Sequence, residues 1–177
     1  MAEAQSQPRL AKRPVTRLAG PYGHPVHPAL ITVPIGAWLA ALIFDLASHV
    51  VATPAFLTQG ARWLIAIGIL GALAAAVFGL LDLFAIPGRT PAFRTGLVHM
   101  SINIVVVAAY VINLLLRVGD PVTGPVSWGL VVFSAVSLAL LGWSGYLGGK
   151  LAYGYGVRVA DETRQAEGFR TVPAKAH

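Results

Sequence analysis

Two histidines that each precede a proline are the residues of this chain best suited to hold a metal ion or a haem iron. His24 and His27 lie in the segment GHPVHP, residues 23–28, directly before a long apolar run. A residue before proline is pushed away from helical backbone angles, so we expect both histidines to be non-helical, with His27 capping the helix that Pro28 begins. The positive end of a helix dipole disfavours a protonated imidazole there. A neutral imidazole keeps the lone pair that a metal requires.

A third histidine, a carboxylate and two arginines are expected near this pair. His99 lies roughly 9 Å into the third apolar run, and Asp82 roughly 6 Å from the end of the second, at the rise of an α-helix. Imidazoles are axial ligands of haem iron and arginines bind carboxylates such as the propionates, so the set suits haem b. Histidines with a carboxylate equally suit another transition metal, and a polar cluster without any ligand is the third interpretation. The predicted haem site consists of His24, His27, His99, Arg89 and Arg94, and the alternative metal site of His24, His27, Asp82 and His99.

A stripe of polar side chains follows one face of the third apolar run. At 100° per residue its members fall within about 80° of one another on a helix. The rest of this run is mostly Ile, Val, Ala and Leu, so the stripe should face the interior of a bundle. It suits interhelical hydrogen bonds, or a path for protons or a small solute. The stripe consists of His99, Asn103, Tyr110, Asn113 and Arg117.

The first apolar run carries a shorter stripe of Trp38, Asp45 and His49. Asp45 and His49 are one helical turn apart, which favours a local hydrogen bond between them. The alternatives are a proton relay, in which both residues would extend the polar path of the third run, and a binding site at the outer end of the helix.

Small residues are spaced along the second and fourth runs in rows that allow close contact between helices. These rows are Gly71, Ala75 and Gly79 in the second run, and Ser137, Ser144 and Gly148 in the fourth.

The elements that must position all these residues are membrane helices. The chain has 177 residues, of which 56% are hydrophobic and only 11% are charged, whereas a soluble domain has about 25% charged residues. Its apolar residues fall into four runs, each long enough to cross about 30 Å of hydrocarbon. We therefore predict an all-α fold, an integral membrane four-helix bundle, over residues 20–159, without a convincing internal sequence repeat. The predicted helices cover residues 29–53, 61–86, 92–117 and 126–150.

Lysine and arginine predict the orientation of this bundle. All but two of the 13 such residues lie on the side of the two termini, the exceptions being Arg62 and Arg117. Because positive loops stay in the cytoplasm, we expect cytoplasmic termini and a multi-pass protein of the inner (plasma) membrane. Orientation and anionic lipid explain the net charge of +6, so we expect no nucleic-acid partner. Residues 1–19 are predicted to form a disordered basic tail and residues 160–177 a cytoplasmic tail.

Several chemistries have no basis in this sequence. The chain has no cysteine, which excludes disulfides, thiol catalysis and a cysteine-ligated iron–sulfur cluster. It also lacks a nucleophile elbow, an HExxH motif and a Walker motif. We therefore expect no catalytic activity of its own.

The order of the motifs resembles one bacterial membrane family. The resemblance covers residues 20–159 and is carried by GHPVHPALITVPIGAW, FDLASH, GLLDLFAIP, LVHMSIN and GWSGYLGGKLAYGYGVRV. These segments are similar to membrane proteins with the domain of unknown function 2231. The resemblance implies four membrane helices, and relatives fused to Rieske-type domains imply a link to membrane electron transfer. It carries a polar signature onto His24, His27, Asp45, Asp82 and His99.

One position departs from that family. Some relatives have a histidine in the GGxL segment, where this chain has Lys150. If that histidine is an axial ligand in the relatives, haem binding here depends on His24 or His27.

Three functions are therefore open. The first is a redox-associated membrane protein that binds haem b or a metal between its helices, or that is the membrane partner of an electron-transfer enzyme. The second is a small channel or transporter for protons or a solute, and the third is a structural subunit of a membrane complex with no ligand. The expected partners are the lipid bilayer and either a second copy, as a homodimer, or a larger membrane redox complex.

Overall fold

Four long helices make up most of the chain, as the sequence predicts. The computed structural model describes residues 8–119 and 122–169, which contain helices and turns but no strand. The prediction of an all-α membrane bundle is confirmed. The helical segments that are long and apolar enough to cross a membrane are Val26–Ala47, Ala55–Phe84, Pro91–Arg117 and Trp128–Gly154.

The first of these segments is two helices joined at Ile31. Pro34 has no N–H to donate to the carbonyl one turn earlier, which explains why the helix is interrupted here. The elements in chain order are η1 (Arg17–Ala19), α2 (Val26–Leu30), α3 (Thr32–Ala47), α4 (Ala55–Phe84), α5 (Pro91–Arg117), α6 (Trp128–Gly149), the π-helical turn η2 (Lys150–Gly154) and α7 (Glu162–Glu167).

Proline decides where several of these helices begin. Pro54 is the N-cap residue of α4, so this helix starts six residues before the predicted residue 61. Thr90 caps α5 by accepting a hydrogen bond from the N–H of Phe93 at 3.1 Å, with Pro91 at the first helical position. The far limit of α3 is residue 47 rather than 53, because the chain turns at residues 48–54 to enter α4.

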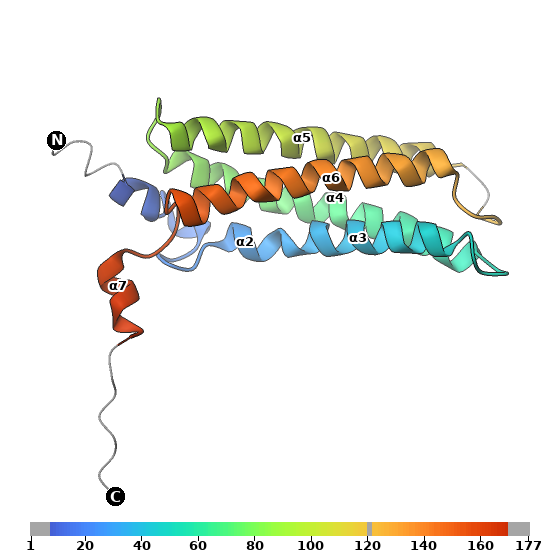
Figure 1. Cartoon of the computed structure of the whole chain (residues 1–177), viewed down its shortest axis with the longest axis horizontal. Helices are drawn as coiled ribbons and strands as arrows, with labels where there is room; N and C mark the ends of the chain where they lie inside the picture. Colours follow the sequence, from blue (N-terminus) through green and yellow to red (C-terminus); the bar gives the residue numbers. More distant parts are fainter. Residues whose placement is uncertain (1–7, 120–121, 170–177) are drawn as a thin grey trace, which may run out of the picture.

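The helices form a ring of four neighbours. α3 packs on α4, α4 on α5, α5 on α6, and α6 packs back on α3, so α3 and α5 lie on opposite corners of the bundle. Figure 1 shows the N-terminal helix at residues 8–12 and α7 at the same end, which we call the terminal end. The opposite end, with residues 48–54, 118–119 and 122–127, is called the far end.

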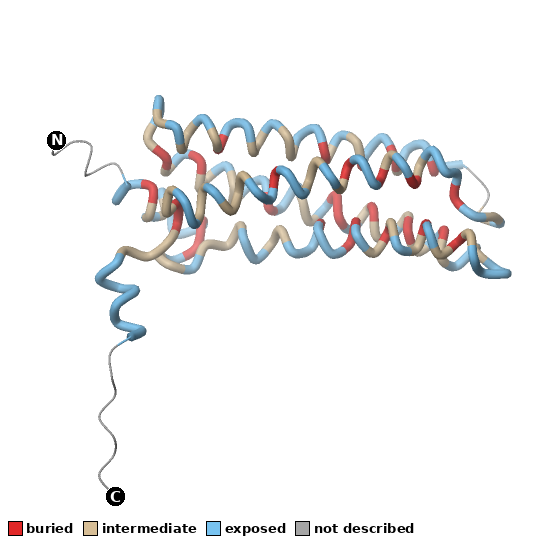
Figure 2. The backbone as a smooth tube through the Cα atoms, viewed as in Figure 1, coloured by how far each residue is buried: buried red, intermediate tan, exposed pale blue. Residues whose placement is uncertain are grey.

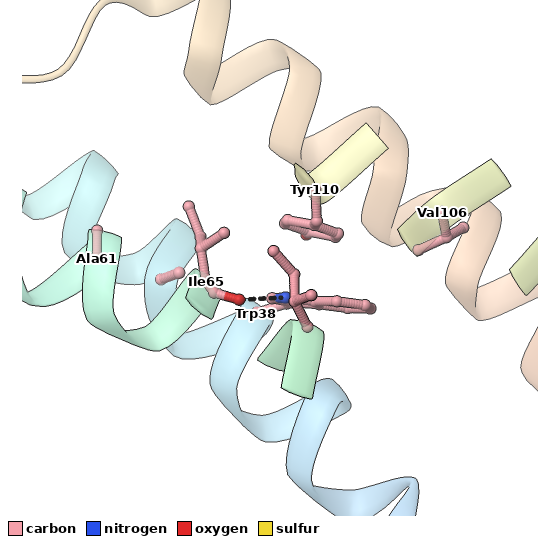
Figure 3. Packing of buried hydrophobic residues seen from close by; sticks show 7 residues of the cluster. Trp38, Ala61, Ile65, Val106 and Tyr110 are labelled. Atoms are coloured by element: carbon pink, nitrogen blue, oxygen red, sulfur yellow. Dashed lines mark hydrogen bonds between the residues drawn. The ribbon is translucent and has the colours of Figure 1, made fainter. Parts of the chain in front are cut away.

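The centre of the bundle is a narrow apolar core. The rings of Trp38 and Tyr110 stack with centroids 4.0 Å apart and planes 9° apart. Trp38 Nε1 donates a hydrogen bond to the carbonyl of Ile65 at 3.2 Å (Figure 3). Exposed residues recur along all four long helices (Figure 2). Many of them are large and apolar, such as Leu70, which is 68% exposed. Such a surface suits lipid, which is as apolar as leucine.

Residues 8–12 and 17–19 are helical, although the sequence predicts a disordered basic tail there. Ala11 is buried in an apolar cluster with Leu83, Ile86 and Val157. The sequence does not indicate this contact, because it depends on one alanine in a segment that is otherwise rich in basic residues. The other predicted tail residues, 1–7 and 170–177, lie outside the described residues.

Candidate functional site

Two of the predicted histidines meet near the terminal end of the bundle. The ring centroids of His27, in α2, and His99, in α5, are 6.4 Å apart and their planes are 86° apart. His27 Nδ1 lies 2.8 Å from the carbonyl oxygen of Ala75, and His99 Nδ1 lies 2.8 Å from that of Ser144. A carbonyl oxygen only accepts, so each Nδ1 carries the hydrogen and each Nε2 keeps the lone pair.

His27 is nevertheless helical, so the prediction of a non-helical cap residue is wrong. α2 begins at Val26 with Pro25 as its N-cap residue, which places His27 and Pro28 in the first turn. The N–H groups of a first turn have no acceptor within the helix, so a proline there leaves no hydrogen bond unmade. His24, by contrast, lies outside any helix, as predicted.

Glycines bring both rings against neighbouring helices. A Cβ atom on Gly79 of α4 would lie 2.9 Å from His27 Cε1, and one on Gly148 of α6 would lie 3.3 Å from His99 Cε1. The rows of small residues in α4 and α6 therefore receive these imidazole rings.

Asn103 contacts the ring of His99 from one turn along α5. Its Nδ2 lies 3.2 Å from His99 Nε2, 2.9 Å from the His99 carbonyl and 2.7 Å from Ser144 Oγ. The lone pair of His99 is therefore shared with an amide. Within the described residues, no hydrogen bond reaches Nε2 of His27.

The remaining members of the predicted metal and haem sites do not join the two rings. His24, Arg89 and Arg94 are exposed. Asp82 forms an ion pair with Arg158. In the described part of the chain, no group of three or more His, Cys, Asp and Glu side chains is placed to hold a metal ion. The structure thus brings two of the proposed ligands together.

The sequence alone does not indicate the role of Arg158, which enters the orientation argument only as one of the 13 Lys and Arg residues. Its Nε lies 2.8 Å from Asp82 Oδ1, in an ion pair without the alignment of a good hydrogen bond. Its Nη2 donates to the carbonyls of Ala19 and Gly20 at 2.8 and 3.2 Å. Arg158 is only 4% exposed and has a left-handed φ of 61°. It therefore ties the end of α4 to the segment that leads into α2.

A second polar cluster lies toward the far end. Arg117 donates from Nη1 and Nη2 to the two carboxylate oxygens of Asp45, at 2.8 and 2.6 Å. Arg117 Nε donates to Asn113 Oδ1 at 2.7 Å, and Asn113 Nδ2 donates to Ser134 Oγ at 3.0 Å. Asp45 and Arg117 are both buried. This cluster joins α3, α5 and α6.

His49 does not take part in that cluster. The Asp45 carboxylate is occupied by Arg117, so the local hydrogen bond expected between Asp45 and His49 is not formed among the described residues. Instead the His49 ring stacks on Trp128, with centroids 4.1 Å apart and planes 18° apart.

The predicted polar path is divided into these two clusters. Between them lie Trp38, Ile65 and Val106, each at most 1% exposed. Tyr110 belongs to the apolar layer through its ring and to the far cluster through its hydroxyl, which donates to the Ser134 carbonyl at 3.4 Å. The polar side chains therefore bond mostly to one another and do not form a continuous row.

Comparison with known proteins gives one match. The model of a family described as a predicted membrane protein (DUF2231) matches residues 23–161. No curated protein and no solved structure matches the chain.

Proposed function

The chain belongs to the DUF2231 family of predicted membrane proteins, and we propose that its His27 and His99 imidazoles hold one transition-metal ion inside the bundle. The observation that carries the proposal is the pair of Nδ1 contacts to the backbone carbonyls of Ala75 and Ser144, both at 2.8 Å. Metal-binding histidines typically donate their other ring N–H to a carbonyl or carboxylate, which fixes the ring and presents the lone pair. Both rings meet this requirement before any ion is bound.

The geometry supports a single ion better than haem b. Gly79 and Gly148 already place both rings against helix backbones. A porphyrin between the rings would have to push them further toward α4 and α6, where Gly79 and Gly148 already leave no space, whereas an ion needs only the space between two ring edges. Arg89 and Arg94 are exposed, and within the described residues no contact directs them toward the rings as propionate partners.

The ion would take Nε2 of His27 and Nε2 of His99, with water in the remaining positions. Imidazole nitrogen suits iron, copper, nickel and zinc. Binding requires Asn103 to release His99 Nε2, which it now contacts at 3.2 Å. With a redox-active ion, the chain would serve as the membrane partner of an electron-transfer enzyme. It would act in the inner (plasma) membrane with cytoplasmic termini, as a homodimer or within a larger redox complex.

The first test is metal analysis of the protein purified in detergent, with visible spectra of the oxidised and the reduced form. We expect a bound transition metal that is lost in His27→Ala and His99→Ala and kept in His24→Ala and His49→Ala. A Soret band that shifts on reduction would assign haem instead of a single ion. A folded protein that stays colourless and metal-free after growth with metal and haem supplied would rule out both.

A second candidate, a carrier of protons or a small solute, is favoured by the polar clusters near both ends of the bundle. The stacked rings of Trp38 and Tyr110 lie between the clusters, so transport would require this layer to open. The test is pH-dependent flux into liposomes, which His99→Ala and Asp45→Asn should abolish. A folded chain that gives no flux and binds no ligand would favour the structural subunit.

A further inference from the structure

The two halves of the chain make the same contacts at matching positions. In the first half the His27 ring bonds to the carbonyl of Ala75 and rests on Gly79, four residues later. In the second half the His99 ring bonds to the carbonyl of Ser144 and rests on Gly148, again four residues later. A histidine at the terminal end thus docks on the following long helix in the same way twice.

The match continues eleven residues further along both helices. Trp38 follows His27 and Tyr110 follows His99 at this same spacing. Trp38 donates from Nε1 to the carbonyl of Ile65, and Tyr110 donates from its hydroxyl to the carbonyl of Ser134. The acceptors match as well. Ile65 lies 10 residues before Ala75, and Ser134 lies 10 residues before Ser144.

Matching residues also touch one another across the bundle. Asp45 and Arg117 are 72 positions apart and form the buried ion pair. The same separation in sequence relates His27 to His99 and Trp38 to Tyr110, whose rings also contact each other. Residues that meet their own counterparts are the signature of a two-fold axis.

These three pairs run along most of the bundle. His27 and Asp45 are separated by roughly 27 Å of helix at 1.5 Å per residue. α3 and α5 run in the same direction from the terminal end and lie on opposite corners (Figure 1). The axis therefore lies along the bundle, which is the direction of the membrane normal for parallel repeats in membrane proteins.

We propose that the half with α2, α3 and α4 and the half with α5 and α6 are two copies of one helical hairpin, docked about this axis. The surface that each half presents fits a hairpin of the same kind. Two aspartates or two arginines facing each other at the third pair would repel, so divergence to Asp45 and Arg117 joins the halves with opposite charges. Divergence at such pairs also explains why the sequence shows no convincing repeat.

The test exchanges the polar residues of the far cluster (Asp45, Asn113, Arg117 and Ser134) with their counterparts in the other half of the chain. Ala41 is the counterpart of Asn113 at the same 72-residue separation as Asp45 and Arg117. The rotated variant is therefore Ala41→Asn, Asp45→Arg, Asn113→Ala and Arg117→Asp, with Ile65→Ser and Ser134→Ile to move the hydroxyl that accepts from Asn113. We expect each single charge reversal, Asp45→Arg or Arg117→Asp, to lower the yield of monodisperse protein strongly. The rotated variant should recover it, with a midpoint of thermal unfolding within about 5 °C of the wild type.

A second exchange keeps the inference testable if the rotated cluster fails to accumulate. The double variant Trp38→Tyr with Tyr110→Trp reverses the central stack while both carbonyl acceptors stay in place. We expect its midpoint of unfolding to lie above that predicted by adding the losses of the two single variants. A rotated cluster no better than the single charge reversals, together with an additive stack exchange, would overturn the inference. So would single charge reversals that cause no loss.

Discussion

Asp45 of α3 and Arg117 of α5 form an ion pair with two hydrogen bonds, and both side chains are sealed from solvent. The Asp45 side chain is 0% exposed and the Arg117 side chain 2%. The distance from Nη1 to Oδ1 is 2.8 Å, and that from Nη2 to Oδ2 is 2.6 Å. Asn113 takes the remaining Nε donor of the arginine at 2.7 Å. The pair is thus nearly satisfied internally, which is the condition under which buried charges are tolerated.

Removing one charge of this pair should destabilise the bundle strongly. Asp45→Asn or Arg117→Gln leaves a single buried charge, which costs about 3–5 kcal/mol. We expect each variant to lower the midpoint of thermal unfolding in detergent by roughly 10 °C. The double variant should lose less than the sum of the two, because no unpaired charge remains. Additive losses would show that the two side chains do not depend on each other.

Gly79 should be essential for the position of the His27 ring. A Cβ atom there would lie 2.9 Å from His27 Cε1, so Gly79→Ala should displace the ring and break its bond to Ala75. Gly142→Ala is the matched control, because no atom of the described residues lies within 4 Å of a Cβ atom at that position. We expect metal content and the midpoint of unfolding to fall in Gly79→Ala and to stay unchanged in Gly142→Ala. Equal behaviour of the two variants would contradict this packing.

Arg158 should control the attachment of residues 8–19 to the bundle. Arg158→Ala removes the ion pair with Asp82 and the hydrogen bonds to the carbonyls of Ala19 and Gly20. We expect trypsin to cleave this segment faster, while the bundle itself stays folded. Arg89→Ala is the control, since Arg89 also has a left-handed φ, of 63°, but is exposed. A cleavage rate that is the same in both variants would contradict the attachment.

The short helix α7 should depend on pH through its cap residue. The N–H of Arg164 donates to Asp161 Oδ1 at 3.0 Å, and this bond, with the nearby Tyr22 hydroxyl, holds the pKa of the Asp161 carboxyl below its usual range. Because its pKa is depressed, the Asp161 carboxylate stabilises α7 fully at pH values above the ordinary carboxyl pKa. This stabilisation is lost as the pH falls through the lower pKa of the folded state.

We therefore expect the helical NMR chemical shifts of residues 162–167 to disappear as the pH falls from about 5 to about 2. Asp161→Asn is the control, because an asparagine caps a helix without titrating there. Loss of helix over the same pH range in both proteins would assign the transition to other groups.

The sequence predicts the membrane helices well because their length and polarity are local properties. The same holds for the stripe on α5: Tyr110, Asn113 and Arg117 are buried as predicted. Hydrogen bonds across helices are different, because they depend on how the helices pack. The sequence therefore favours a bond from Asp45 to His49, one turn away, whereas the structure pairs Asp45 with Arg117.

The histidine pair shows the same limit. The sequence places His27 and His99 near the same end of the bundle, and the structure brings their rings within 6.4 Å. The sequence could not show that His24 stays exposed or that Asp82 is held by Arg158, since both depend on the turn before α2 and the segment after α6. Only packing decides which members of a polar set meet.

The central claim is that His27 and His99 together bind one transition-metal ion, and the most direct measurement is calorimetric titration of the metal-free protein with Cu²⁺. Copper is chosen because nitrogen ligands bind it most tightly among the divalent first-row metals. We predict saturable binding of one ion per chain, abolished by His27→Ala and by His99→Ala and unchanged by His24→Ala and His49→Ala. Absence of saturable binding to the folded protein, or equal binding by all four variants, would contradict the account.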